Sequence, residues 1–514
     1  MESWPKLVTT ALMGTSRQAP SAPASEGALK SLVDQLDWHQ PERALLGVAG
    51  AIALHQQVGW QPVKKDWPSV KPCALDDLPY VANAIARYLE IAWDRYAETL
   101  PELLSLIAQA GQRVPERQLP KLLQLGQQTA KLRPIIAAAV GKRGQWLAAQ
   151  NSDWGYAQVA GGEAFEPDSP QLQAVWQNGR RSERVLLLQR WRQADPDAAR
   201  VALEAIWSTV SAKEREVLIN ELGTNLTMAD EPFLEAALSD RAKSVRQAAA
   251  HQLVRLPNSR LCQRMTVRTQ PLVQLQGEGR SFTVAVTLPA VHEPEWAQDG
   301  IPAKAQSGKS QRGGWLEQLL AATPLDAWGN PSTAIPATQN HAWQEILIRG
   351  WGLAAERQQR ADWAAALASS SAASSLLDNA LMGQLLALLP APQQAQQLQA
   401  QLPSQPTEED SLRWLNLVAQ SHQDWDLAFS QSVLARLVAM AQSNPRKSYA
   451  LAYETRNLRL TLHPDLAPEV AIALERLANI AHTSRHWESS LLELLQYLSF
   501  RREIRQAFQA QASH

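Results

Sequence analysis

The sequence predicts a mainly α-helical protein: a helical-repeat array with a small β-hairpin inserted in the middle of the chain. Three observations support this fold class. Apolar residues recur at helical spacing through most of the chain, and Ala, Leu and Gln, which favour helices, are abundant. Two segments, 186–207 and 232–253, resemble each other in sequence. Two stretches of alternating apolar and polar residues, 266–276 and 280–289, flank a Gly-Glu-Gly triplet and predict the hairpin.

The composition is that of a folded protein with several domains or an extended array. The chain has 514 residues, of which 45% are hydrophobic and 19% are charged, and its formal net charge is -1. This length exceeds what one ordinary core accommodates. The near-neutral charge argues against general binding of polyanions, although it leaves room for a local basic patch.

The sequence also predicts a cytoplasmic location. Its two cysteines, Cys73 and Cys262, lie far apart, which excludes a disulfide framework and fits a reducing compartment. The first residues include small side chains like those of a signal peptide, but their apolar run is short and is interrupted by Thr9 and Thr10. No apolar run approaches the roughly 20 residues that span a bilayer. We therefore expect no membrane contact.

Helical and polar segments divide the chain into four predicted parts. These are an N-terminal helical domain (1–158), a HEAT-like repeat segment (159–265), a hairpin with a long loop (266–335) and a C-terminal helical-repeat domain (336–514). The polar stretch 160–170 predicts the first boundary. Residues 290–314 predict a long loop, and loops of such length in compact domains are usually functional or disordered.

The two similar segments predict a HEAT-like repeat. Asp195 and Asp240 lie 45 positions apart, each in a short turn, and a single gap aligns Arg200 with Arg246. A period near 45, formed by two helices and a turn that carries Asp, is typical of HEAT repeats. We assign these four residues to the repeat framework. Asp230 is the predicted cap of the first helix in the second copy. Solenoids usually need three or more copies, so the repeat count stays open.

A run of basic residues extends through the second copy and beyond it. Between Arg241 and Arg268 there are seven Lys or Arg residues and no Asp or Glu. Arg246 is expected to contact Asp240 or nearby turn carbonyls. For the other cations, a solvated face or ion pairs with distant acids are commoner than a phosphate-binding strip. If a basic contact surface exists, we expect it at Arg255, Arg260, Arg264 and Arg268.

No catalytic, cofactor-binding or metal-binding residue is predicted. Residues 308–310 read Gly-Lys-Ser, but the glycine that a phosphate-binding loop needs five positions earlier is Ala303, so a polar loop is expected. His482 and His486 are spaced for one helix face, yet a third ligand is missing and Thr483 stands where zinc proteases have Glu. Nineteen Trp residues are many for this length. Six of them fall within helical patterns and are expected to pack in the core or between helices, with an aromatic binding surface as the alternative: Trp191, Trp207, Trp343, Trp351, Trp363 and Trp414.

Several stretches together resemble a family of uncharacterised bacterial proteins that are helical and HEAT-like. The matching stretches are 11–17, 141–154, 230–264, 315–328 and 350–367, of which 230–264 is the most specific. Members of that family are encoded beside MoxR-type AAA+ ATPases, von Willebrand A domain proteins and SWIM zinc-finger proteins. The resemblance implies a scaffold or adaptor in a chaperone-like assembly, and it supplies no catalytic residues.

Three functions remain open at the level of sequence. The first is a non-enzymatic adaptor without a cofactor that binds protein partners, among them a MoxR-type AAA+ ATPase or a von Willebrand A domain protein. The second is a nucleic-acid-binding protein that resembles helical-repeat DNA glycosylases and uses a basic groove. The third is an enzyme with an unrecognised site near the 290–314 loop.

Overall fold

The computed structural model describes most of the chain. The described residues are 3–25, 27–58, 71–160, 169–278, 281–304, 310–402, 407–421, 424–443, 448–478 and 485–512. Within these ranges, no helix has both the length and the apolar character that crossing a membrane requires.

The chain forms two compact units, Met1–Pro72 and Cys73–His514. The first unit contains α1 (Ser3–Met13), α2 (Gly27–Val33) and α3 (Pro41–Val58). Its buried core is small and consists of Leu7, Val33, Val48 and Ile52. The sequence analysis did not anticipate a boundary after Pro72, so the predicted domain 1–158 spans parts of both units. The other predicted domain boundaries stay predictions.

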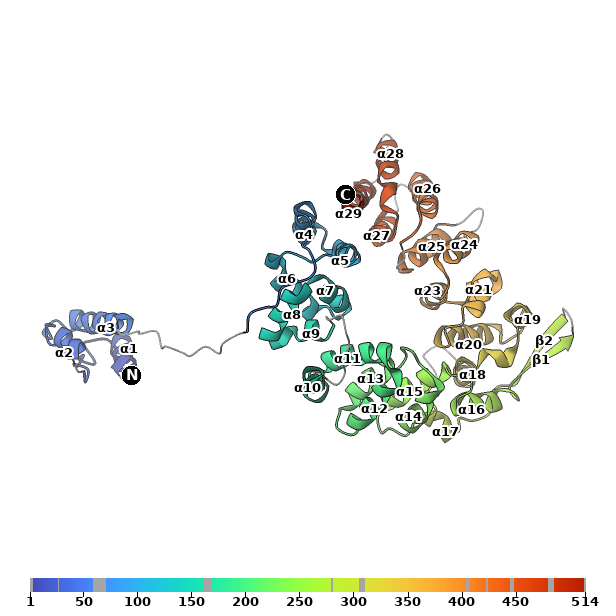
Figure 1. The fold of residues 1–514 in the computed structure, drawn as a ribbon, viewed down its shortest axis with the longest axis horizontal. Coiled ribbons are helices and arrows are strands. Elements are labelled where there is room, and N and C mark those ends of the chain that lie inside the picture. Colours follow the sequence, from blue (N-terminus) through green and yellow to red (C-terminus); the bar gives the residue numbers. More distant parts are fainter. Residues whose placement is uncertain are drawn as a thin grey trace. The chain divides into compact units, whose positions relative to one another are not determined.

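The second unit is a long succession of short helices (Figure 1). Its first half contains α4 (Asn83–Arg95), α5 (Leu100–Gln109), α6 (Leu119–Gln128), α7 (Arg133–Ala139), α8 (Gly141–Gln150), α9 (Tyr156–Ala160), α10 (Pro170–Asn178), α11 (Arg181–Ala194), α12 (Pro196–Ile206), α13 (Ala212–Glu221), α14 (Glu231–Ala237), α15 (Lys243–Val254) and α16 (Arg260–Thr269). The strands β1 (Val273–Glu278) and β2 (Ser281–Val286) follow.

The second half continues the helical pattern to the end of the described chain. It contains α17 (Pro294–Gln298), α18 (Gln311–Ala322), α19 (Pro331–Ala337), α20 (Gln344–Arg357), α21 (Ala361–Ser369), α22 (Ser371–Leu376), α23 (Asn379–Ala387), α24 (Ala391–Gln401), α25 (Glu408–Gln420), α26 (Leu427–Ser443), α27 (Ser448–Leu458), α28 (Ala467–Ala478) and α29 (Arg485–Ala512). Short 3-10 turns, η1 (Ala97–Thr99), η2 (Glu116–Gln118), η3 (Ala130–Leu132), η4 (Ser152–Trp154), η5 (Met228–Asp230), η6 (Leu325–Trp328) and η7 (Pro464–Leu466), join some of them.

Helices in the second unit pack mainly on the helix next but one. Such contacts join α11 to α13, α13 to α15, α18 to α20, α25 to α27 and α27 to α29, while α12, α14 and α28 pack beside this row. Apolar residues at helical spacing explain the pattern, since Val245, Ala249 and Leu253 of α15 all lie on its buried face. The prediction of a mainly α-helical array with one small hairpin is confirmed.

The hairpin is shorter at its start than the sequence predicts. β1 pairs antiparallel with β2, with Val273 opposite Val286 and Leu275 opposite Val284. The predicted first strand began at residue 266, but Thr266 to Thr269 belong to α16. The Ser259 hydroxyl caps this helix by accepting a hydrogen bond from the Cys262 N–H at 3.3 Å. Burial of one helix face outweighs the alternation of residue types there.

Long polar side chains from one helix pair reach the carbonyl groups at the helix ends of a neighbouring pair. Arg255 donates to the Gly223 carbonyl at 3.1 Å, and Gln358 donates to the Thr323 carbonyl at 2.8 Å. Arg413 donates to the Leu377 carbonyl at 2.8 Å in the same manner. The last carbonyls of a helix lack partners within it and attract cations. These contacts connect positions 32 to 36 residues apart and therefore recur at about the length of a helix pair.

Arg192 and Asp230 form an ion pair with both side chains fully buried. The guanidinium donates to both carboxylate oxygens, at 2.8 and 2.9 Å, and also to main-chain carbonyls, including those of Leu222 and Asn225. The prediction that Asp230 caps α14 is wrong. Its side chain instead accepts a hydrogen bond from the Thr227 N–H at 3.0 Å, in the capping box of the preceding 3-10 turn.

The buried pair gives a clear stability prediction. The Asp230→Ala variant leaves the Arg192 guanidinium buried without its counter-ion, so we expect the free energy of unfolding to fall by about 3–5 kcal/mol. Asp195→Ala is the matched control, because it removes only the cap of α12 and should cost about 1 kcal/mol. Urea unfolding followed by circular dichroism measures both. Equal losses in the two variants would contradict a dominant role for the pair.

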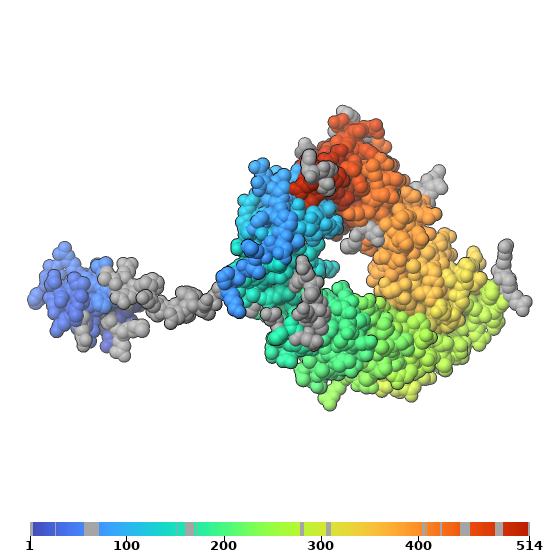
Figure 2. All heavy atoms as spheres, in the orientation of Figure 1, coloured from blue at the N-terminus to red at the C-terminus, as the bar shows by residue number. Residues whose placement is uncertain are grey.

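The last helix of the second unit contacts the first helices of the same unit. α29 packs against α4 and α5, and the Tyr96 and Phe500 rings stack with centroids 4.4 Å apart. Glu102 of α5 receives Arg501 at 2.5 Å and Arg505 at 2.6 Å. The helical array of this unit therefore closes on itself, and Figure 2 shows its atoms around an opening.

Two carboxylates, Glu102 and Asp424, each pair with both Arg501 and Arg505 where α29 meets α5, and Glu102 is the less exposed of the two. Glu102→Gln leaves Arg501, whose side chain is only 1% exposed, with the exposed Asp424 as its remaining carboxylate partner among the described residues, so we expect α4, α5 and α29 to exchange amide hydrogens at least about 10-fold faster. Hydrogen exchange read by mass spectrometry measures this. Glu503→Gln, an exposed position on α29, is the control and should leave the exchange rates unchanged. Equal protection of these helices in both variants would show that Glu102 does not hold the closure.

Candidate binding pocket

The predicted repeat residues of the first copy have structural roles. The Asp195 side chain caps α12 by accepting a hydrogen bond from the Ala198 N–H at 2.9 Å. Arg200 does not pair with Asp195. Its guanidinium lies 2.7 Å from Asp197 and 3.5 Å from Asp230, so it reinforces the buried pair described above.

The second copy uses its Asp and Arg in a different way. Arg246 donates to the main-chain carbonyls of Asp240 and Arg241, at 2.8 and 3.1 Å, which is one of the two contacts predicted for it. The Asp240 carboxylate accepts from the Ala242 N–H at 2.8 Å and pairs with Arg215 at 2.8 Å. Burial acts to raise the pKa of Asp240, but these hydrogen bonds outweigh it and hold that pKa below its ordinary value.

Acidic partners compensate the basic run. Arg260 pairs with Glu231 at 2.7 Å, and Arg264 pairs with Glu235 at 2.5 Å. These two ion pairs join α16 to α14. Arg260 and Arg264 therefore form ion pairs with acids that are distant in sequence. A contact surface at Arg255, Arg260, Arg264 and Arg268 stays a prediction, and any such surface carries less free charge than the sequence suggests.

A sequence signal for these pairs existed and was missed. The two glutamates are four residues apart on α14, and Arg260 and Arg264 are four residues apart on α16. Side chains at this spacing share a helix face. Two adjacent helices with matched spacing can therefore form both ion pairs at once. The sequence predicts these pairs only when α14 and α16 are known to be adjacent.

Residues 299–303, which follow α17, are anchored at both ends. The Asp299 carboxylate, at the end of α17, binds Arg264 at 2.7 Å and Arg268 at 2.5 Å. Further along, the Trp315 ring N–H donates to the Ala303 carbonyl at 2.9 Å. This part of the predicted 290–314 loop is therefore an ordered wall, and the arginines of α16 hold it in place.

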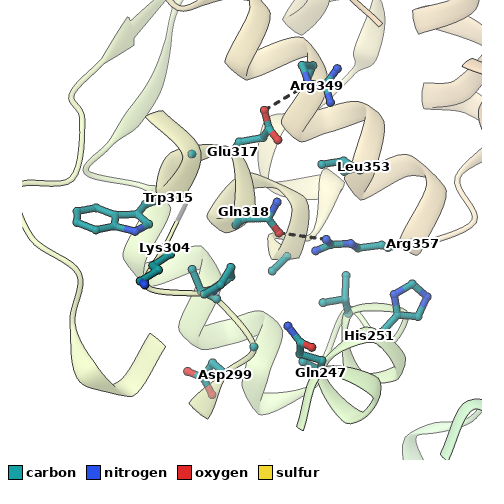
Figure 3. Close-up of a pocket in the computed structure, with 17 residues that line it drawn as sticks. Gln247, His251, Asp299, Lys304, Trp315, Glu317, Gln318, Arg349, Leu353 and Arg357 are labelled. Atoms are coloured by element: carbon teal, nitrogen blue, oxygen red, sulfur yellow. Dashed lines mark hydrogen bonds and ion pairs between the residues drawn. The ribbon is translucent and has the colours of Figure 1, made fainter. Parts of the chain in front are cut away.

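A polar pocket of about 380 Å³ lies against this wall (Figure 3). Its other walls are α15, α18 and α20. The polar side chains that line it are Gln247, His251, Asp299, Lys304, Glu317, Gln318, Arg349 and Arg357. Cavities of this size hold a small organic molecule or a few residues of a peptide. The predicted enzyme site near the 290–314 loop lies close to this pocket, but catalytic activity stays a prediction.

Two glycines allow the pocket walls to approach each other. A Cβ at Gly350 of α20 would lie 2.7 Å from the Leu320 side chain and 3.3 Å from the Glu317 carbonyl. The backbone of α20 therefore packs directly against α18 at this position. Gly300 has φ +88°, and a Cβ there would lie 2.8 Å from Ala250 of α15. Both positions need glycine because a larger residue would separate the walls.

The two arginines of α20 have different partners. Arg349 lies 3.5 Å from Glu317 and 3.0 Å from Asp378, so its charge is compensated. Arg357 donates to the Gln318 side-chain oxygen at 3.2 Å. Among the described residues, no carboxylate forms an ion pair with Arg357. Burial lowers the pKa of Arg357, and the charges of Glu356 and Glu317 only partly oppose this.

His251 lies beside the same guanidinium. Partial enclosure lowers the pKa of its imidazole, and the positive charges of Arg357 and Arg255 lower it further. The ring is therefore neutral at neutral pH and can donate one hydrogen bond and accept another. The pocket thus combines a cation with neutral hydrogen-bonding groups.

Other sequence predictions have separate outcomes. Of the six Trp residues expected in the core or between helices, Trp191, Trp351, Trp363 and Trp414 are buried, and Trp207 and Trp343 are half-buried. Gly308, Lys309 and His482 lie outside the described residues. Ser310 caps α18 by accepting from the Gly313 N–H at 3.2 Å. In the described parts of the chain, no three His, Cys, Asp or Glu side chains gather as a metal site would require.

The fold and the pocket define a class: a helical-array protein with a polar cavity between neighbouring helix pairs. The chain belongs to DUF5691, a family of unknown function whose pattern matches residues 6–508. The comparison with curated proteins finds no match.

The imidazole of His251 gives a pH prediction. Its pKa in the folded protein lies below the ordinary value of 6.5, so the unfolded chain binds this proton more readily. Its contribution to stability is complete above pH 6.5 and is lost as the pH falls toward the folded-state pKa. Urea unfolding near pH 7.5 and pH 5.5 should therefore show a smaller acid-induced loss in His251→Gln than in the wild type. His39→Gln is the control, and an equal effect in it would refute the assignment.

Proposed function

We propose that this protein is a non-enzymatic, HEAT-like scaffold or adaptor that binds protein partners in the cytoplasm. The partner we favour is a MoxR-type AAA+ ATPase or a von Willebrand A domain protein, as the family resemblance implies. The repeated packing of each helix on the helix next but one supports a solenoid scaffold. The recurring contacts to helix-end carbonyls, one helix pair apart, support the same reading.

The observation that carries the proposal is an apolar stripe on the first unit. Trp4, Val8 and Leu12 follow each other at four-residue steps along α1, and all three are exposed. Leu12 is 83% exposed, and Leu46 of α3, in the same unit, is 72% exposed. A unit of three helices with so small a core gains much from covering such a stripe. A helix with apolar residues at this spacing suits a groove on a partner protein.

Nucleic-acid binding has less support. Three of the seven cations in the run that motivated it, Arg260, Arg264 and Arg268, pair with Glu231, Glu235 and Asp299. A polyanion would have to compete with these carboxylates for the same guanidinium groups. The proposal therefore retains protein partners and does not extend to DNA or RNA.

A binding titration tests the proposal. The purified full chain is titrated with the purified MoxR-type ATPase and with the von Willebrand A domain protein of the same organism, and binding is read by biolayer interferometry. We expect saturable binding to one of them. Leu12→Lys places a charge in the stripe and should weaken that binding at least about 10-fold, as loss of a hot-spot residue does.

Val267→Lys is the matched control, because Val267 is 70% exposed but lies on α16 of the second unit. This variant should bind like the wild type. Absence of binding to both candidate proteins would overturn the choice of partner. Equal loss in both variants would overturn the assignment of the α1 stripe.

A further inference from the structure

The pocket between α15, α18 and α20 contains one half-buried cation, Arg357, that forms no ion pair with a carboxylate of the described residues. Lys304 also lines the pocket without such a partner, but it is exposed and its charge is solvated. The acids that line it already have arginine partners: Asp299 binds Arg264 and Arg268, and Glu317 binds Arg349. Arg357 has only a neutral hydrogen-bond partner, the Gln318 side chain. Charge balance in the pocket therefore leaves a place for one negative charge.

The surroundings of Arg357 make this imbalance costly. Its side chain is half-buried and lines the cavity. An enclosed guanidinium has lost much of its water and is stabilised by an anion that forms paired hydrogen bonds with it. Figure 3 shows Arg357 and Gln318 joined across the pocket, with His251 and Gln247 on the opposite helix, α15.

We propose that this pocket binds a ligand that carries a single carboxylate, which forms a paired hydrogen bond with the Arg357 guanidinium. The flat fork of a guanidinium matches the two oxygens of a carboxylate. The amide of Gln247 and the neutral ring of His251, both on α15, line the same cavity and can donate further hydrogen bonds. This site is additional to the partner-binding stripe of the first unit and does not depend on it.

The remaining lining decides between classes of anion. Asp299 and Glu317 also line the cavity, but arginines compensate them, so Arg357 supplies one enclosed positive charge. That charge balances a carboxylate, whereas the second charge of a phosphate would have to be balanced by the exposed Lys304 or by solvent. Leu353, Val254 and Trp315 provide apolar surface beside the polar groups. A monocarboxylate with an apolar body fits both features. The carboxylate can belong to a free organic acid or to the C-terminus of a peptide.

Saturation-transfer NMR on the full chain tests the site with a matched pair of probes. Benzoate and benzamide have nearly the same shape, and only benzoate carries the negative charge. We expect benzoate to bind at least about 10-fold more tightly, because hydrogen bonds to a charged group outweigh neutral ones. Equal binding of the two probes, or binding of neither, would overturn the proposal without any variant.

Variants then place the site. Arg357→Met should lose the preference for benzoate, and Arg357→Lys should retain part of it, since the charge remains but the fork is gone. Arg360→Gln is the control, because this arginine pairs with Asp326 and Asp362 on the surface and does not line the pocket. Circular dichroism checks that each variant is folded. An unchanged preference in folded Arg357→Met and Arg357→Lys would place the anion elsewhere.

A second pair of probes separates the two sources of the carboxylate. A pentapeptide that ends in a free C-terminal Phe is compared with the same peptide as an amide. Tighter binding of the free acid peptide than of benzoate indicates a protein C-terminus as the natural ligand. Tighter binding of benzoate indicates a small organic acid. Either result supports the carboxylate site, and failure of all the acids overturns it while leaving the adaptor proposal to its own test.

Discussion

The carbonyl groups at the ends of short helices are the constraint on which the second unit depends. Each helix leaves its last carbonyls without internal partners, and a chain of many short helices has many such groups near its interior. Main-chain carbonyls in the structure receive donors from neighbouring helix pairs. The donors include Arg192, Arg255, Gln358, Arg413 and Arg501. These contacts satisfy buried polar groups and at the same time set how one helix pair stacks on the next.

This constraint also explains the distribution of charge. Some of the arginines that reach a neighbouring helix pair also pair with an acid that lies roughly one helix pair away in sequence. Arg192 with Asp230 and Arg260 with Glu231 are examples. A stretch of sequence can therefore look strongly basic while the folded surface above it is nearly balanced.

The sequence predicts the helices well because their periodicity is local. Val245, Ala249 and Leu253 mark the buried face of α15 without knowledge of any neighbour. Contacts between helix pairs are harder to predict, because they depend on which helices become neighbours. For this reason, the prediction that Asp230 caps α14 missed its buried ion pair with Arg192. The pocket is a stronger case, since Gln318 and Arg357 meet 39 residues apart only after α18 and α20 have stacked.

The basic run of α16 and the pocket are parts of one arrangement. Arg264 and Arg268 hold Asp299, and Asp299 begins the wall that carries Gly300 against α15. Those two arginines thereby neutralise an acid that would otherwise face the cavity unpaired. If Asp299 were unpaired, its charge would compensate Arg357 across the pocket and an external anion would gain little. Because Arg264 and Arg268 pair with Asp299, the positive charge of Arg357 remains available to a ligand.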